Sequence, residues 1–137
     1  MWVNNTFISI TVRYLLKEII IKKIIISEKK KKRYIIYGAG AAGSQLAFNS
    51  KYSNNIKIVG FFDDKKELWN RELNGIKVYN PSEVENLKNI FDGVLLAIPS
   101  LNNKSRKKII NYISEFNIPI LQIPSINEIT SGKNNIS

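Results

Sequence analysis

Three glycines at the spacing G-x-G-x-x-G are the first feature of this sequence that could do chemistry. Residues 38–43 read Gly-Ala-Gly-Ala-Ala-Gly and follow the short apolar run 34–37. Between a strand and a helix, such glycines permit a tight turn, let a pyrophosphate approach the backbone and let the two elements pack closely. Free N–H groups and the dipole at the helix start then favour a phosphate. The pattern predicts a nucleotide-binding turn made of Gly38, Ala39, Gly40, Ala41, Ala42 and Gly43.

A pair of carboxylates follows at the spacing that a dinucleotide site requires. Asp63 lies 20 positions after Gly43, at the end of the apolar run 56–62, and Asp64 comes next. A carboxylate at the end of the second strand can accept hydrogen bonds from the adenosine ribose. It also disfavours a 2′-phosphate, so among the NAD(P) cofactors we expect NAD to be favoured over NADP. A solvated Asp-Asp turn and a ligand-free strand–helix turn remain the alternatives for the two motifs.

A third candidate lies at the end of a fourth predicted strand, residues 93–98. Pro99 and Ser100 follow this strand, and open α/β sheets bind ligands outside the carboxyl ends of their strands. Both residues are therefore predicted to contribute to the cofactor site. The basic residues just beyond them fit a solvated helix face better than an anion site; these are Lys104, Arg106, Lys107 and Lys108.

Composition removes several classes of enzyme chemistry. The sequence has neither cysteine nor histidine. Disulfides, thiolate metal sites, cysteine nucleophiles, Ser-His-Asp triads and a histidine base are thereby excluded. We assign no catalytic residue and no metal ligand.

The remaining pattern supplies the elements that must position these motifs. Apolar runs predict parallel strands that alternate with amphipathic helices, whereas residues 65–74 are expected to form a loop or short helix. Ser82 is predicted to cap the second helix with Glu85. This alternation predicts an α/β, Rossmann-like three-layer fold with an open, mostly parallel five-stranded sheet, preceded by an N-terminal basic helix. The expected strands are 34–37, 56–62, 76–79, 93–98 and 118–123, the expected helices are 41–50, 81–90 and 105–116, and a last helical turn is expected at 125–130.

Residues 1–33 form a leader that differs from the predicted domain at 34–137. Of the 21 Lys and Arg residues, nine lie in residues 13–33, against Glu18 and Glu28. The apolar stretch 2–12 is too short to span a bilayer and lacks the flanks of a signal peptide. Isoleucine triplets between lysines predict a helix with an apolar stripe and basic flanks.

Such a leader fits an anionic membrane surface, or the cytoplasmic end of a spanning helix whose start is missing. A helix packed on its own domain and a poorly ordered arm are the alternatives. No nucleic acid is expected as a partner, because the lysines lack the aromatic platforms of a phosphate-tracking groove.

Five segments together resemble a known family. They are 34–43, 59–64, 96–100, 123–125 and 131–133. In order and spacing they are similar to the amino-terminal Rossmann (CoA-binding-like) domain of CapD-like polysaccharide biosynthesis proteins. These are membrane-bound nucleoside-diphosphate-sugar epimerases and 4,6-dehydratases, which carry transmembrane helices and a basic juxtamembrane stretch before this domain.

The resemblance implies a second, catalytic Rossmann domain that binds NAD(P) and a UDP-sugar, and this domain is not in the sequence. We therefore interpret the chain as a fragment, a truncated gene or a single-domain form, whose missing catalytic half is a separate domain or a downstream partner chain. It is expected at the cytoplasmic face of a bacterial inner membrane, or in the cytoplasm if residues 1–33 do not anchor it.

Two alternatives from other classes stay open. The early strands also resemble the UDP-sugar-binding domain of a sugar acetyltransferase, although hexapeptide repeats are lacking here. The domain could also be a non-catalytic ligand-sensing or assembly module at the membrane.

Overall fold

The computed structural model describes residues 2–122, with the side chains of residues 5–26 and 30–122. The chain divides into two compact units, Met1–Lys31 and Lys32–Ser137. The helical turn expected at 125–130 and the resemblance segments after Gln122 lie outside the described residues.

The first unit is a single helix, α1 (Trp2–Lys30). Its large apolar side chains are exposed, from 48% at Val12 to 68% at Tyr14. The expected single apolar stripe is wrong, because consecutive residues are about 100° apart on a helix and Ile19–Ile21 alone extend over more than half a turn. Apolar and basic residues therefore alternate around α1. In the part of the chain that the structure describes, no helix is long and apolar enough to cross a membrane.

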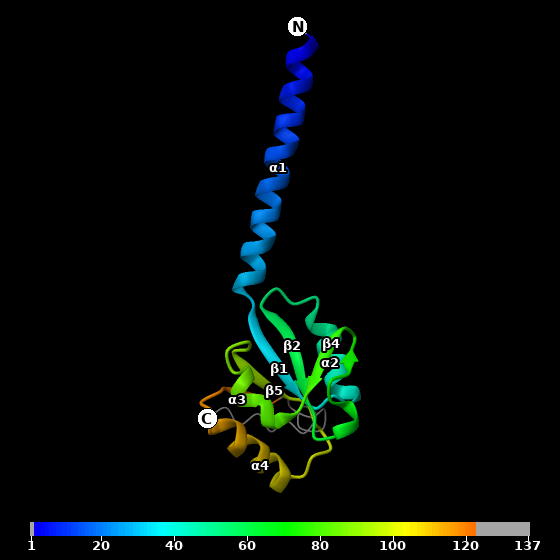
Figure 1. Cartoon of the computed structure of the whole chain (residues 1–137), viewed down its shortest axis with the longest axis vertical. Helices are drawn as coiled ribbons and strands as arrows, with labels where there is room; N and C mark the ends of the chain where they lie inside the picture. Colours follow the sequence, from blue (N-terminus) through cyan, green and yellow to red (C-terminus); the bar gives the residue numbers. More distant parts are fainter. Residues whose placement is uncertain (1, 123–137) are drawn as a thin grey trace, which may run out of the picture. The chain divides into compact units, whose positions relative to one another are not determined.

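The second unit is built on one sheet with the strand order β3-β4-β2-β1-β5-β6 (Figure 1). All neighbouring strands pair in parallel except β3 and β4, which are antiparallel. The order reverses beside β1, where β2 lies on one side and β5 on the other. The strands are β1 (Lys32–Tyr37), β2 (Ile56–Phe62), β3 (Glu72–Leu73), β4 (Ile76–Tyr79), β5 (Gly93–Leu96) and β6 (Ile120–Gln122).

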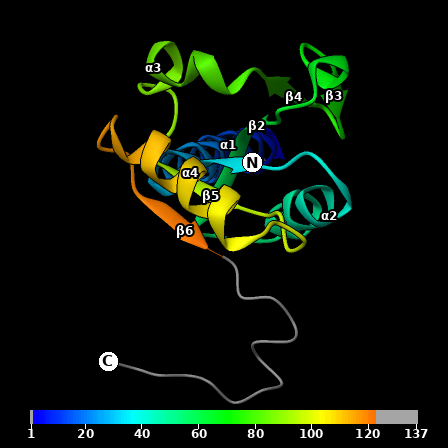
Figure 2. The same cartoon turned by 90° about the horizontal axis from the view of Figure 1, so that it is seen from below.

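Helices cover both faces of this sheet, and the core is accordingly divided in two (Figure 2). On one face Ile36 and Phe61 pack with Ala47 of α2; on the other Ile35 and Phe62 pack with Ile113 of α4. Ile35 and Ile36 lie on opposite faces because side chains alternate along a strand. The helices are α2 (Ala41–Ser50), η1 (Lys66–Leu68), η2 (Pro81–Glu83), α3 (Val84–Leu87) and α4 (Asn103–Ser114).

The α/β three-layer prediction is confirmed, and its five parallel strands are all present. The sheet has a sixth strand, β3, in the segment 65–74 expected to be a loop or short helix, and the short helix η1 forms in the same segment. Asn74 and Gly75 connect β3 to β4 with φ of 53° and 78°. Two consecutive residues with positive φ make the tight turn that antiparallel neighbours prefer.

Three local expectations also need correction. Ser82 does not cap the helix after β4; Asn80 does, since its side chain accepts from the Ser82 N–H while Glu83 accepts from the Asn80 N–H. The predicted helix 81–90 is a 3₁₀ turn followed by the short α3. The strand expected at 93–98 ends at Leu96, because Ile98 and Pro99 already belong to the turn toward α4.

Candidate nucleotide site

The turn between β1 and α2 brings the carboxyl ends of three strands together. Gly38 has φ of 110°, a conformation that favours glycine, and its N–H donates to the Phe62 carbonyl of β2 at 2.7 Å. A Cβ added to Gly38 would lie 2.9 Å from the Ala97 carbonyl oxygen and 2.7 Å from Cγ1 of Ile98. The glycine turn therefore packs directly against the end of β5, where the strand order reverses.

The other two glycines of the motif face different surroundings. A Cβ on Gly43 would collide with the Gly38 carbonyl oxygen, so glycine at this position allows α2 to pack against its own turn. Among the described residues, a Cβ on Gly40 would have no atom within 4 Å, and the φ and ψ of Gly40 (−79° and −164°) suit any residue. In this part of the chain the fold requires Gly38 and Gly43, whereas no contact requires Gly40.

The first turn of α2 opens onto this free space. Gly40 is the N-cap, and no side chain caps the helix. Ala41 and Ala42 are exposed, and the Ser44 N–H is bonded to the Gly40 carbonyl. The helix thus presents N–H groups and the positive end of its dipole beside a glycine with room next to it.

Asp63 borders the same turn. Its Oδ2 accepts from the Ala39 N–H at 2.8 Å, and its Oδ1 accepts from the Lys65 N–H at 2.8 Å. Each carboxylate oxygen thus has one backbone donor, and a second lone pair of each is left for other donors. These two hydrogen bonds hold the half-buried carboxylate in place, and both of its oxygens can still accept another hydrogen bond.

Trp69 holds the backbone of Asp63, a role that the sequence did not indicate. Its Nε1–H donates to the Asp63 carbonyl at 2.7 Å. The indole is half-buried and packs on the α2 side of the sheet. An aromatic residue six positions after an aspartate gives no signal by itself, because the contact depends on how η1 folds back.

Asp64 is engaged differently from Asp63. Its Oδ1 accepts from the Tyr37 hydroxyl at 2.7 Å. Burial, the hydrogen bond to Asp64 and the nearby carboxylate charges together raise the pKa of Tyr37 far above its usual range. The Asp64 carboxylate therefore accepts the hydrogen bond of the Tyr37 phenol, and Tyr37 is only 3% exposed. Only the remaining lone pairs of Asp64 are available to a ligand.

Pro99 and Ser100 lie in the exposed loop after β5, two to three residues beyond the contact between Gly38 and Ala97. The loop begins where the Ala97 N–H donates to the Tyr37 carbonyl at 3.0 Å. The structure thus places both residues at the same edge of the sheet as the glycine turn. It shows no hydrogen bond between them and Asp63.

The basic residues of α4 differ in exposure. Lys104, Lys107 and Lys108 are exposed, as a solvated helix face would be. Arg106 is half-buried, and its Nε is buried without a hydrogen-bond partner among the described residues. It occupies the same face of the helix as Ile109, Ile110 and Ile113, which pack on the core.

The described residues contain no group of His, Cys, Asp and Glu that could hold a metal ion. An uncapped helix start, a glycine with free space and a fixed carboxylate lie together at the carboxyl ends of the strands, where open α/β sheets generally bind their ligands.

A family model for the C2185-like N-terminal domain matches residues 30–119 of this chain. The chain belongs to the C2185-like N-terminal family. The match contains the glycine turn, Asp63 and the loop after β5, so the whole candidate site lies in the family domain. No curated protein matches the chain.

Solved structures similar to this C2185-like domain have the same fold. The UDP-D-quinovosamine 4-dehydrogenase from Vibrio fischeri is 34% identical with a TM-score of 0.68, over 75% of this chain and 86% of that one. The Rex-family repressor RSP is 18% identical with a TM-score of 0.61, over 80% of this chain and 60% of its own. RSP in complex with β-NADH gives a TM-score of 0.60 at the same identity, over 78% of this chain and 60% of that one. The likeness to RSP shows the fold alone.

Proposed function

We propose that the C2185-like domain binds a nucleotide at the glycine turn, with its phosphates at the start of α2 and a ribose at Asp63. The observation that carries the proposal is the free space at Gly40, beside an uncapped helix start. A glycine that the fold does not require has its simplest explanation in a ligand that must come close to the backbone.

NAD is the favoured ligand, and a UDP-sugar is the second. The free lone pairs of Asp63 suit the two hydroxyls of a ribose, and the charge of Asp63 repels a 2′-phosphate. Gly38, Ala39, Gly40, Ala41, Ala42 and Gly43 would hold the phosphates, and Asp64, Pro99 and Ser100 would border the rest of the ligand. The 34% identity with a protein described as a UDP-D-quinovosamine 4-dehydrogenase supports a sugar nucleotide as the alternative.

In a wider role, the domain serves as an accessory part of a nucleoside-diphosphate-sugar dehydratase or epimerase of surface polysaccharide synthesis. We assign no catalytic residue to the site, and in this proposed role a separate catalytic domain or partner chain would perform the reaction. The exposed apolar and basic residues of α1 support attachment to the cytoplasmic face of a membrane through residues 13–33. Nucleic acid has no part in the proposal. A downstream reading frame that encodes a catalytic Rossmann domain would support this role, and a hexapeptide-repeat acetyltransferase there would contradict it.

Calorimetric titration of the full chain with NAD, NADP, UDP and a UDP-sugar tests the site. Gly40→Asp adds charge and bulk where a phosphate would lie, without a steric conflict within the domain. Asn54→Asp makes the same change of charge in an exposed loop at the other end of the sheet and serves as the control.

Saturable binding that Asn54→Asp retains and Gly40→Asp abolishes is the expected result. The preferred ligand then distinguishes the dinucleotide from the sugar-nucleotide role. If a folded chain binds none of the four, or if Gly40→Asp binds as well as the wild type, the proposed site is wrong.

A further inference from the structure

The amino ends of β1 and β2 lie at the end of the domain opposite the glycine turn. Lys32 pairs with Ile56, and the Lys32 N–H donates to the Asn55 carbonyl at 2.9 Å. Helix α2 runs back from the glycine turn and ends at Ser50, and residues 51–55 then lead into β2. The carboxyl end of α2 therefore lies at the same end of the domain as the starts of β1 and β2.

This end of the domain exposes two aromatic side chains. Phe48 is 50% exposed and Tyr52 is 78% exposed, and their rings meet edge to face with centroids 6.0 Å apart. The Lys51 Nζ lies 5.9 Å from the Phe48 centroid. The rings contact each other and a lysine rather than the core, so their apolar surface stays in water.

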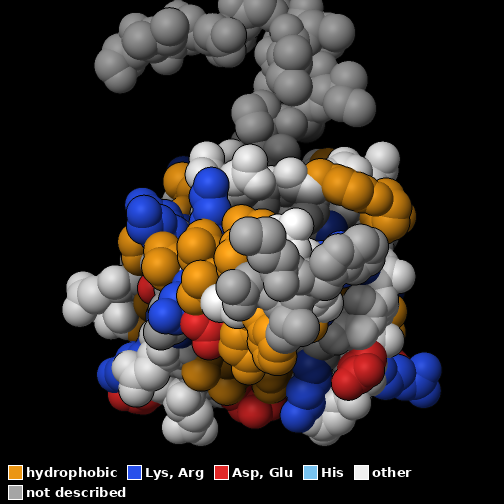
Figure 3. All heavy atoms as spheres, turned by 90° about the horizontal axis from the view of Figure 1, so that it is seen from above, with side chains coloured by type: hydrophobic (Ala, Val, Ile, Leu, Met, Phe, Trp, Pro, Cys, Tyr) orange, Lys and Arg blue, Asp and Glu red, His pale blue; other side chains and the backbone are white. Residues whose placement is uncertain are grey.

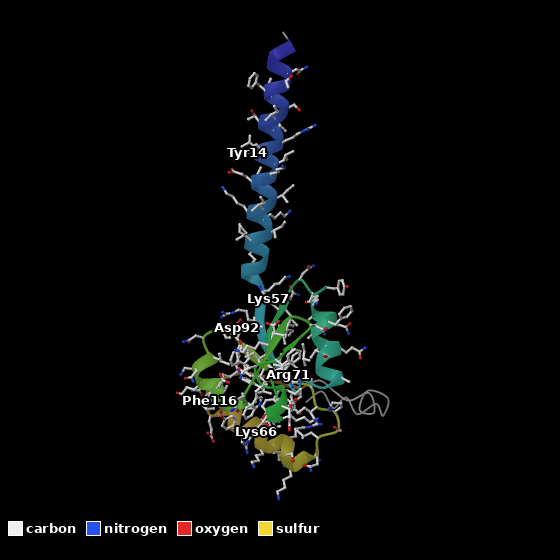
Figure 4. All side chains as sticks on the ribbon, turned by 45° about the vertical axis from the view of Figure 1, so that its right-hand side comes forward. Tyr14, Lys57, Lys66, Arg71, Asp92 and Phe116 are labelled. Atoms are coloured by element: carbon white, nitrogen blue, oxygen red, sulfur yellow. The ribbon has the colours of Figure 1, made fainter. Side chains whose placement is uncertain are left out.

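The same end is basic. Lys32, Lys51 and Lys57 are exposed there. The carboxylate Asp92 lies at this end too, with Oδ1 3.1 Å from the Arg33 guanidinium and close enough to Lys32 for that charge to help lower its pKa, so the three lysines and Arg33 outnumber it. Figure 4 shows Lys57 and Asp92 at this end of the domain and Lys66 toward the other end. Over the chain as a whole, Figure 3 shows Lys and Arg side chains interspersed with hydrophobic ones.

We propose that this surface, the amino-end patch of Lys32, Phe48, Lys51, Tyr52 and Lys57, rests on an anionic bilayer. Aromatic rings suit the headgroup layer, where their apolar bodies are buried and a phenol stays wet. Lysines keep their charge among anionic headgroups while their stems cover apolar surface. All five residues belong to the unit Lys32–Ser137, and only Lys32 is shared with the basic stretch 13–33 of the leader.

The patch would orient the domain on the membrane. The six residues of β1 separate it from the glycine turn by about 20 Å at a rise of about 3.3 Å per residue. A domain that rests on this end therefore keeps its candidate nucleotide site facing the solvent. The proposal does not require the identity of the nucleotide.

The absence of native cysteine allows a direct test, because one introduced cysteine is the only labelling site. Full-length Tyr52→Cys, Lys66→Cys and Leu15→Cys chains are labelled with an environment-sensitive fluorophore. Each is mixed with vesicles of phosphatidylglycerol and with vesicles of phosphatidylcholine. We expect a blue shift at position 52 with phosphatidylglycerol only, and no shift at position 66.

A shift at position 15 without one at position 52 would show that the leader alone binds, which overturns the proposal. No shift at any position overturns it as well. A shift at position 52 that appears without vesicles and grows with protein concentration would assign the patch to a second copy of the chain instead. Phosphatidylcholine giving the same shift would refute the charge dependence.

A charge reversal provides the second measurement. Lys51→Glu should weaken binding to phosphatidylglycerol vesicles more than about fivefold, since each basic residue near such a surface contributes about fivefold. Lys66→Glu changes the net charge equally at the other end of the domain and should have the smaller effect. Equal weakening by both variants would attribute the binding to net charge and would contradict a docked face.

Discussion

The carboxylate of Asp63 accepts a hydrogen bond from the backbone N–H of Ala39 at 2.8 Å, across 24 positions of sequence. This bond connects the end of β2 to the middle of the glycine turn. The turn is therefore held in shape by the residue that would bind the ribose, and the two halves of the candidate site are positioned together.

Asp63→Asn is expected to impair both stability and binding. The amide keeps one acceptor oxygen but places an NH₂ group against a backbone N–H, which should cost about 1–3 kcal/mol of unfolding free energy. NAD affinity should fall about tenfold while discrimination against NADP is reduced. Denaturant unfolding and calorimetry measure the two effects.

Asp64→Asn is the control for that loss of charge. The side chain at position 64 accepts one bond, from the Tyr37 hydroxyl, and the oxygen of an amide can accept it as well. If Asp64→Asn lowers the NAD affinity as much as Asp63→Asn does, Asp63 has no specific role in binding the ribose.

Alanine at two glycines should separate folding from binding. Gly43→Ala places a methyl group on the Gly38 carbonyl and should destabilise the domain by about 1–3 kcal/mol. Gly40→Ala meets nothing and should change stability by only about 0.5 kcal/mol while it reduces nucleotide affinity. Thermal unfolding beside calorimetry checks this, and a Gly40→Ala chain less stable than Gly43→Ala would contradict the geometry of the turn.

Tyr37 should make stability depend on pH in the alkaline range. Its pKa in the folded domain is raised, so its contribution is fully present below the unfolded pKa of about 10 and is lost as pH rises beyond it. Tyr37→Phe should be less stable than the wild type at pH 7 and should lack this part of the alkaline loss. Denaturant midpoints over an alkaline pH series provide the measurement, and parallel curves for the two chains would contradict the expectation.

The Arg33–Asp92 ion pair should make stability depend on pH in the acidic range. The guanidinium and the backbone N–H of Arg33 both donate to Asp92 and lower its pKa. A lowered carboxyl pKa stabilises the fold above the unfolded value of about 3.9, and this stability is lost as pH falls through the folded value. Arg33→Gln should lower the unfolding temperature at pH 7, and the difference should shrink below about pH 4. The expected difference in unfolding temperature is small because both side chains are over 40% exposed. If the difference stays constant down to pH 2, the ion pair is not its cause.

Much of this fold follows from local patterns in the sequence. Runs such as Ile35-Ile36 and Phe61-Phe62 are apolar on both faces because helices cover both sides of a parallel sheet. Gly38 and Gly43 mark a strand–helix turn by their spacing alone. The strand β3 was not predicted because Glu72 and Leu73 are too few to show alternation, although Asn74-Gly75 was a signal for a hairpin.

The sequence by itself therefore determined the order of the five parallel strands, the glycine turn and the acidic strand end, since each depends on residues that are neighbours along the chain. Only the tertiary structure decided that Asp63 holds Ala39 while Asp64 holds Tyr37, and that Trp69 fixes the backbone between β2 and η1. It also separated Gly40, which has free space, from Gly43, which has none. These distinctions arise from contacts between distant segments, and the distances that create them exist only once the strands have paired.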